Sequence, residues 1–82
     1  MIIRSQNKKV IVNLNMVDTI EERDKQIRYF SGGGMETLGV LGIYSTEEKA
    51  IKVLDMICDA YRNIAFIDEQ AVVFNMPQDS EV

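Results

Sequence analysis

One segment of this chain has the periodicity of an amphipathic helix, and it limits the folds that the rest can adopt. Residues 45–48 read Ser-Thr-Glu-Glu, a capping box in which the Ser45 hydroxyl and the last carboxylate each satisfy a free backbone amide at a helix start. Apolar side chains then recur at helical spacing as far as Tyr61, with charged side chains between them. We therefore predict a helix over about residues 46–62 with one face in the core.

The remaining segments alternate short apolar runs with polar turns, which is typical of antiparallel strands. The strands expected before the helix lie at 2–4, 10–14, 16–22, 26–30 and 37–44, and a strand or packed loop at 64–67 and a final strand at 71–76 follow it. We predict a single α+β domain over residues 1–77, a five- or six-stranded antiparallel β-meander with the amphipathic helix packed on one face and a final strand after the helix. Residues 78–82 are polar and are expected to form a disordered tail.

The sequence has no histidine and one cysteine, and this excludes most catalytic chemistry. A His-containing triad, a His metal site, an internal disulfide and a multi-Cys zinc site all need residues that the sequence lacks. Cys58 has no His to activate it, and its place on the apolar side of the helix predicts a buried structural thiol. Asp55 and Asp59, one turn apart, are interpreted as a solvated face rather than a cation site. We therefore expect no enzyme, no cofactor and no metal.

All five glycines lie between residues 32 and 42. A phosphate-binding loop needs a Gly-Lys-Ser/Thr sequence or a helix start directly after it, and this segment has neither. We interpret the glycines as a turn followed by irregular positions in the next strand.

Charge is distributed unevenly along the chain. Residues 1–30 carry six basic and four acidic side chains, a net charge of +2, and residues 31–82 carry three basic and nine acidic ones, a net charge of −6. A long nucleic acid needs a broader basic surface, whereas a small anionic nucleotide needs only two or three donors. The grouped donors, with two aromatic rings that can stack on a base or donate, are Arg4, Lys8, Lys9, Arg28, Tyr29 and Tyr44. We predict that they form a ligand-binding site; ordinary solubilising charge is the alternative.

Hydropathy predicts a cytoplasmic protein. No apolar run approaches the ~18 residues that span a bilayer, and the first residues turn polar at Arg4, unlike a secretory signal. A single core in 82 residues is thin, commonly worth ~3–5 kcal/mol, so we expect a homo-oligomer. Met35, Met56 and Met76 are candidates for the contact surface, and core filling is the alternative.

Five segments of the chain carry a resemblance to other proteins. They are Met1–Lys9, Val12–Asn15, Leu41–Ala50, Val53–Ile57 and Phe74–Pro77. Together they resemble small proteins encoded by phages and prophages of Firmicutes bacteria. Small phage proteins of this size often counter bacterial immunity, so the resemblance implies a counter-defence protein in the cytoplasm of a bacterial host.

Two modes of action fit such a protein without catalytic groups. One is an oligomeric sponge that binds and sequesters a nucleotide immune second messenger, of the cyclic oligonucleotide or cyclic ADP-ribose type, similar in logic to anti-Thoeris and anti-CBASS proteins. The other is a stoichiometric inhibitor that covers a host defence protein through its acidic surface, as anti-CRISPR proteins do. A structural or assembly protein of the virion is the third hypothesis.

Overall fold

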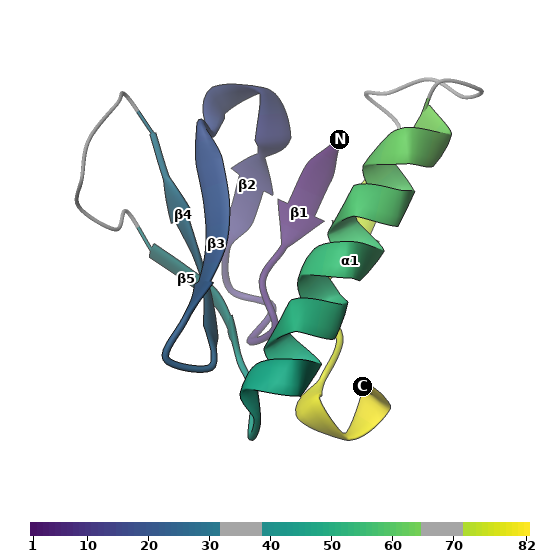
Figure 1. Cartoon of the computed structure of the whole chain (residues 1–82). Coiled ribbons are helices and arrows are strands. Elements are labelled where there is room, and N and C mark those ends of the chain that lie inside the picture. Colours follow the sequence, from purple (N-terminus) through teal and green to yellow (C-terminus); the bar gives the residue numbers. More distant parts are fainter. Residues whose placement is uncertain (32–38, 65–71) are drawn as a thin grey trace.

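The computed structural model describes residues 1–31, 39–64 and 72–82. In them one long helix packs beside two small sheets, an α+β fold (Figure 1). The elements in chain order are β1 (Ile2–Arg4), β2 (Ile11–Asn13), the 3-10 turn η1 (Leu14–Met16), β3 (Thr19–Arg23), β4 (Gln26–Phe30), β5 (Gly39–Ile43), α1 (Glu47–Asn63), β6 (Val73–Asn75) and the 3-10 turn η4 (Asp79–Glu81).

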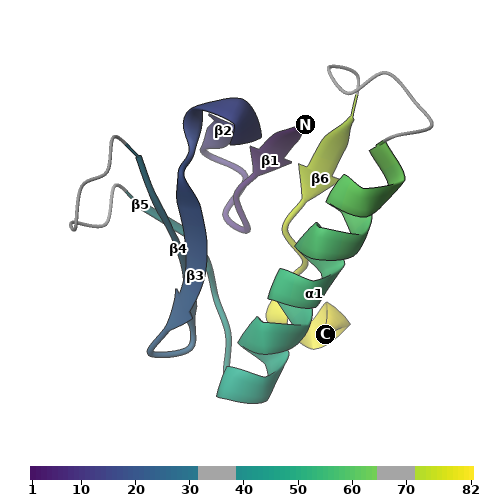
Figure 2. The same cartoon turned by 45° about the horizontal axis from the view of Figure 1, so that its top comes forward.

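The strands do not form the single antiparallel meander expected from the sequence. They form two three-stranded sheets, one in the order β2-β1-β6 and the other in the order β3-β4-β5. β6 pairs with β1 in parallel, with Ile3 opposite Phe74, because the chain passes through α1 before it returns to the first sheet. The β1–β2 hairpin and the β3–β4 hairpin therefore belong to different sheets (Figure 2).

The two sheets separate at η1, in the stretch where the sequence suggests that one strand follows another directly. The Asn13 side chain accepts a hydrogen bond from the Asn15 amide at 3.0 Å and caps this turn. Such a local side-chain bond offers the backbone an alternative to a strand ladder. As a result β2 ends at Asn13 and is shorter than its predicted range of 10–14, and β3 begins only at Thr19 and is displaced from its predicted range of 16–22.

Other predicted segments lie partly or wholly outside the described residues. This holds for the glycine turn at 32–34, and for the strand or packed loop at 64–67, of which only Ile64 is described. The predicted strand at 37–44 is described from Gly39 onward and ends at Ile43.

A two-residue turn, Asp24 and Lys25, closes the β3–β4 hairpin. Both residues have positive φ angles, 54° and 67°, and Arg23 pairs with Gln26 across the turn. This is the geometry of a type I′ turn, whose twist matches that of the flanking strands. The turn fixes the register in which Ile27 faces the core.

α1 extends from Glu47 to Asn63, one residue beyond the predicted range. Its capping residue is Thr46 rather than Ser45, because the Thr46 hydroxyl accepts from the Lys49 amide at 3.1 Å. The Ser45 amide instead donates to the Asp79 carboxylate at 2.7 Å. No helix within the described ranges combines the length and the apolar content that crossing a membrane requires.

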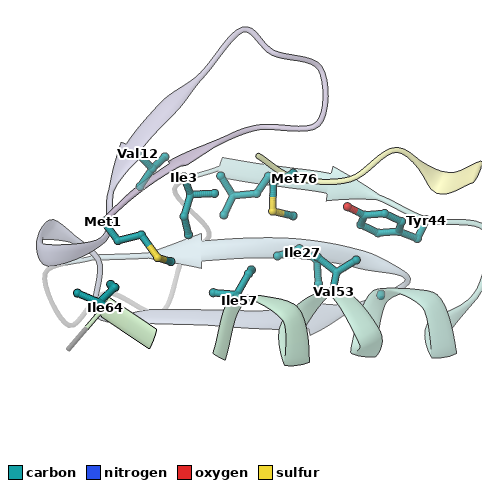
Figure 3. Close-up of a cluster of buried hydrophobic side chains, with 11 residues drawn as sticks. Met1, Ile3, Val12, Ile27, Tyr44, Val53, Ile57, Ile64 and Met76 are labelled. Carbon is teal, nitrogen blue, oxygen red and sulfur yellow. The ribbon is translucent and has the colours of Figure 1, made fainter. Parts of the chain in front are cut away.

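The core lies between α1 and the inward faces of both sheets (Figure 3). Its largest fully buried side chains are Met1, Ile3, Ile27, Leu41 and Val53. They come from the N-terminus, from β1, β4 and β5, and from the helix. One shared core therefore holds both sheets to α1.

Two interpretations of apolar helix and strand residues change with the structure. Cys58 is exposed rather than buried, because it lies on the flank of α1. The buried stripe of the helix consists of Ala50, Val53 and Ile57. Met76 is only 4% exposed and fills the core, whereas Met56 is 40% exposed. Met35 lies outside the described residues.

Candidate binding cleft

Gln6 joins the first hairpin to the second sheet and to the C-terminal segment. Its side-chain amide donates to the carbonyls of Ile43 at 2.9 Å and Pro77 at 3.3 Å, and its side-chain oxygen accepts from the Ile43 amide at 2.8 Å. Its backbone amide donates to the Leu41 carbonyl at 2.7 Å. Gln6 thus occupies the free edge of β5 as a strand residue would, and this brings the β1–β2 turn beside the chain that follows β6.

The last residues of the chain pack against the start of α1. The Asp79 carboxylate accepts from the Ser45 amide at 2.7 Å and forms an ion pair with the Lys49 ammonium at 3.5 Å. Lys49 also donates to the Asp79 carbonyl at 3.1 Å. These contacts order residues 78–82 around η4, where the sequence suggests a disordered tail.

A cleft of about 580 Å³ lies between the first hairpin, α1 and this ordered C-terminal segment. We call it the C-terminal cleft. It is lined by Arg4, Lys8, Met56, residues 75–78 and Glu81. Its volume is within the range of small-molecule sites.

Arg4 and Lys8 are the two cations of the C-terminal cleft, and the hairpin positions one against the other. The Arg4 guanidinium donates through Nε and Nη2 to the Lys8 carbonyl, at 3.4 and 3.3 Å. Lys8 presents that carbonyl because it adopts a positive φ of 65° in the turn. Within the part of the chain that the structure describes, neither side chain forms an ion pair, so both charges are available to an anion.

The other predicted site residues do not line this cleft. Lys9 is exposed in the β1–β2 turn. Arg28 lies on β4 in the second sheet, where it donates to the Gln26 side chain at 3.0 Å and pairs with Asp24 at 3.8 Å. Tyr29 is half-buried and packs against the core. The predicted convergence of these groups with Arg4 is therefore absent, because the hairpin and β4 lie in different sheets.

Tyr44 does not offer the stacking surface that the sequence suggests. Its side chain is only 3% exposed, and its hydroxyl donates to the Pro77 carbonyl at 2.9 Å. Burial, and then the negative charges of Asp79 and Glu81, raise the pKa of Tyr44 to about 12. Tyr44 is thus a core residue that anchors the C-terminal segment.

The pKa of the Asp79 carboxyl is shifted downward, opposite to that of Tyr44. The hydrogen bond from the Ser45 amide is the largest cause that holds the pKa of the Asp79 carboxyl below its usual value. Burial opposes it by less, and the Ser45 side chain and then Lys49 lower the pKa further. The carboxylate therefore stays charged at neutral and mildly acidic pH, and its ion pair with Lys49, which holds the C-terminal segment to the start of α1, persists there.

Sequence reasoning missed the contribution of the last residues to the cleft. Gln78 and Glu81 line it, and the Gln78 amide donates to the Glu81 carboxylate at 2.7 Å. The pattern Gln-x-x-Glu after a proline resembles a capping box and could have indicated an ordered turn. Asn75 also lines the cleft, and no local pattern points to it, because its place depends on the parallel pairing of β6 with β1.

The comparisons with known proteins gave no match. No protein family, no curated protein and no solved structure was found that matches this chain. The resemblance to phage proteins therefore remains a prediction.

Proposed function

We propose that this protein is a non-enzymatic binding protein that captures a small anionic nucleotide in the C-terminal cleft. The observation that carries the proposal is the placement of Arg4 and Lys8 in one cleft, both without an ion pair to another described residue. A phosphate group between a guanidinium and an ammonium accepts charge-assisted hydrogen bonds, which are about twice as strong as neutral ones.

The guanidinium of Arg4 is already oriented for this task. Two of its five N–H groups are directed at the Lys8 carbonyl, which leaves three donors for a ligand. Because the side chain is held in place before binding, less conformational entropy is lost when a phosphate arrives.

The biological role that fits this activity is sequestration. We propose a phage-encoded counter-defence protein that acts in the bacterial cytoplasm and removes a nucleotide immune messenger from solution as an oligomeric sponge. The resemblance in the sequence supports this role, and the cleft supports the ligand class. Stoichiometric binding without turnover is its biochemical signature.

Isothermal titration calorimetry of the whole protein tests the proposal. The panel contains cyclic dinucleotides, cyclic trinucleotides, cyclised ADP-ribose isomers and the four nucleoside monophosphates. We expect saturable heat with at least one of them and unchanged ligand after release. Replacing both cations (Arg4→Ala with Lys8→Ala) should weaken binding at least about tenfold, which follows from losing two charge-assisted contacts.

Lys9→Ala is the matched control for this titration. Lys9 is exposed in the same turn but does not line the cleft, so its loss should leave the affinity within about twofold. An absence of heat with every ligand, or equal losses in the control and the double variant, would contradict the proposal.

Stoichiometric inhibition of a host defence protein is the second candidate function. The observation in its favour is the outward face of α1, where four exposed acids outnumber two exposed bases. These side chains are Glu47, Glu48, Asp55 and Asp59, against Lys52 and Arg62. Such a surface complements a basic channel. A purified basic partner that binds the wild type and the Asp55→Lys, Asp59→Lys variant equally would contradict this candidate.

A further inference from the structure

The C-terminal cleft is not uniformly basic. Glu81, which comes from η4, lines it together with the two cations of the first hairpin. One Glu81 carboxylate oxygen accepts from the Gln78 amide at 2.7 Å, which fixes the orientation of the group. A carboxylate has two acceptor oxygens and about four lone-pair sites, so Glu81 keeps acceptor capacity for a ligand.

A ligand that fits this cleft must therefore combine an anionic group with an edge that carries several donors. Arg4 and Lys8 select the anion, and Glu81 selects the donors. A ligand that is negatively charged throughout would be repelled by the Glu81 carboxylate. A ligand whose edge carries acceptors would also be repelled, because its lone pairs would face those of the carboxylate oxygens. We therefore expect inorganic polyanions to bind less tightly than a ligand that also carries donors.

Among nucleobases, guanine has the edge that matches a carboxylate. Its N1–H and N2–H₂ groups point in the same direction and donate together to the two oxygens of one carboxylate. Adenine presents one donor beside the N1 acceptor, and cytosine presents one donor beside the N3 acceptor. A carboxylate therefore favours guanine over both by direct hydrogen bonding.

The remaining walls suit the flat faces of a base. Met56 lines the cleft from α1 and is 40% exposed, and its thioether packs favourably against aromatic rings. Pro77 lines the cleft from the segment after β6. The Gln78 side-chain nitrogen donates a hydrogen bond to the Gln6 backbone carbonyl at 2.8 Å.

We propose that the nucleotide bound in the C-terminal cleft is a guanine nucleotide, with Arg4 and Lys8 on its phosphate and Glu81 on the N1–H and N2–H₂ edge of the base. This inference rests on the proposed function and adds the base that the site selects.

Calorimetric titration of the whole protein with paired ligands tests the inference. The pairs are guanosine and adenosine monophosphate, and the corresponding cyclic dinucleotides. We expect the guanine member of each pair to bind about tenfold more tightly, which is typical of one bidentate contact to a base. Glu81→Gln should remove most of this preference and leave adenine binding unchanged or stronger. The glutamine oxygen can still accept from the Gln78 amide, so the η4 turn is retained.

Glu48→Gln is the control for the loss of one negative charge, because Glu48 is exposed on α1 and does not line the cleft. It should keep the preference for guanine. Equal affinity for the two bases, or an unchanged preference in Glu81→Gln, would overturn the inference while the proposed function stands. A lack of binding by every nucleotide would overturn both.

Discussion

At the scale of single residues, the cleft depends on side chains that form hydrogen bonds with backbone groups rather than with one another. Arg4 holds the Lys8 carbonyl, Gln6 bridges to β5, and the buried Tyr44 hydroxyl holds the Pro77 carbonyl. The sequence identifies Arg4 and Lys8 as binding candidates from their charge alone. It misplaces Tyr44, because its burial depends on contacts with a segment 33 residues away.

Tyr44→Phe tests the anchor of the C-terminal segment. Loss of the bond to Pro77 should lower the free energy of unfolding by about 1 kcal/mol at neutral pH, the typical worth of one buried hydrogen bond. Urea unfolding followed by circular dichroism measures this change. A variant as stable as the wild type would show that the hydroxyl contributes nothing.

The same variant tests the pKa of Tyr44. A phenol with an ordinary pKa of 10.0 in the unfolded chain and of about 12 in the folded protein keeps its proton longer when folded. The contribution of the Tyr44 phenol to the free energy of unfolding should therefore be fully present below pH 10. It should be lost as the pH rises toward 12, by about 2–3 kcal/mol in total. The Tyr44→Phe variant lacks this loss, so parallel declines in the two proteins would contradict the assignment.

Gly42 faces the same ring, and an added side chain there has no room. A Cβ atom at this position would lie 2.9 Å from the Tyr44 ring and 3.2 Å from the Met76 methyl group. Gly42→Ala should therefore lower the free energy of unfolding by about 1–3 kcal/mol, the usual cost of overpacking a core.

Gly39→Ala is the comparison for this substitution. Its Cβ atom would also meet a ring, that of Tyr29, at 2.7 Å, but Tyr29 is half-buried, so we expect its ring to shift more readily than the buried Tyr44 ring. Thermal denaturation should show the larger loss for Gly42→Ala. The reverse order would mean that the Tyr44 ring is not fixed.

At the scale of elements, local patterns predict the helix well and the sheets poorly. α1 is specified by its own capping residues and its apolar spacing, so its bounds follow from the sequence within a residue or two. The strands are each three to five residues long. Their partners depend on the turn at η1 and on the return of the chain after α1. The parallel pair β1–β6 joins residues about 70 positions apart, which no short pattern specifies.

Gln6→Ala tests how the two sheets are joined. The change removes three side-chain hydrogen bonds, two with Ile43 and one with Pro77. Each is worth about 0.5–1.5 kcal/mol, so the free energy of unfolding should fall by roughly 1.5–4 kcal/mol. Chemical denaturation measures the loss.

Asn7→Ala serves as the control for Gln6→Ala. Among the residues that the structure describes, the Asn7 side chain accepts hydrogen bonds from two partners in its own turn, the Ser5 hydroxyl and the Lys9 amide. Asn7→Ala should lower the free energy of unfolding by less than Gln6→Ala does, and it should leave the edge of β5 intact. Equal losses would mean that Gln6 stabilises its own turn rather than the junction between the sheets.

At the scale of the whole molecule, the two sheets, α1 and the ordered C-terminal segment together create a cleft that no single element contains. The uneven charge along the chain leads to the prediction of a basic N-terminal site, and of the predicted residues Arg4 and Lys8 line the C-terminal cleft. The acidic half contributes Glu81, which gives the cleft its polarity. That combination requires the C-terminal residues to be folded back beside the first hairpin. The Gln-x-x-Glu pattern of residues 78–81 can indicate a local turn, but no local pattern indicates where that turn packs.

The central claim is that a small anionic nucleotide binds between Arg4, Lys8 and the C-terminal segment. Titration of the isotopically labelled protein with guanosine monophosphate, followed by amide and side-chain NMR shifts, tests it most directly. The account predicts saturable shifts concentrated at Arg4, Lys8, residues 75–78 and Glu81, with little change on the outward face of α1. Shifts that are absent with guanosine monophosphate and with every other nucleotide of the calorimetric panel, or that centre on the second sheet, would contradict it.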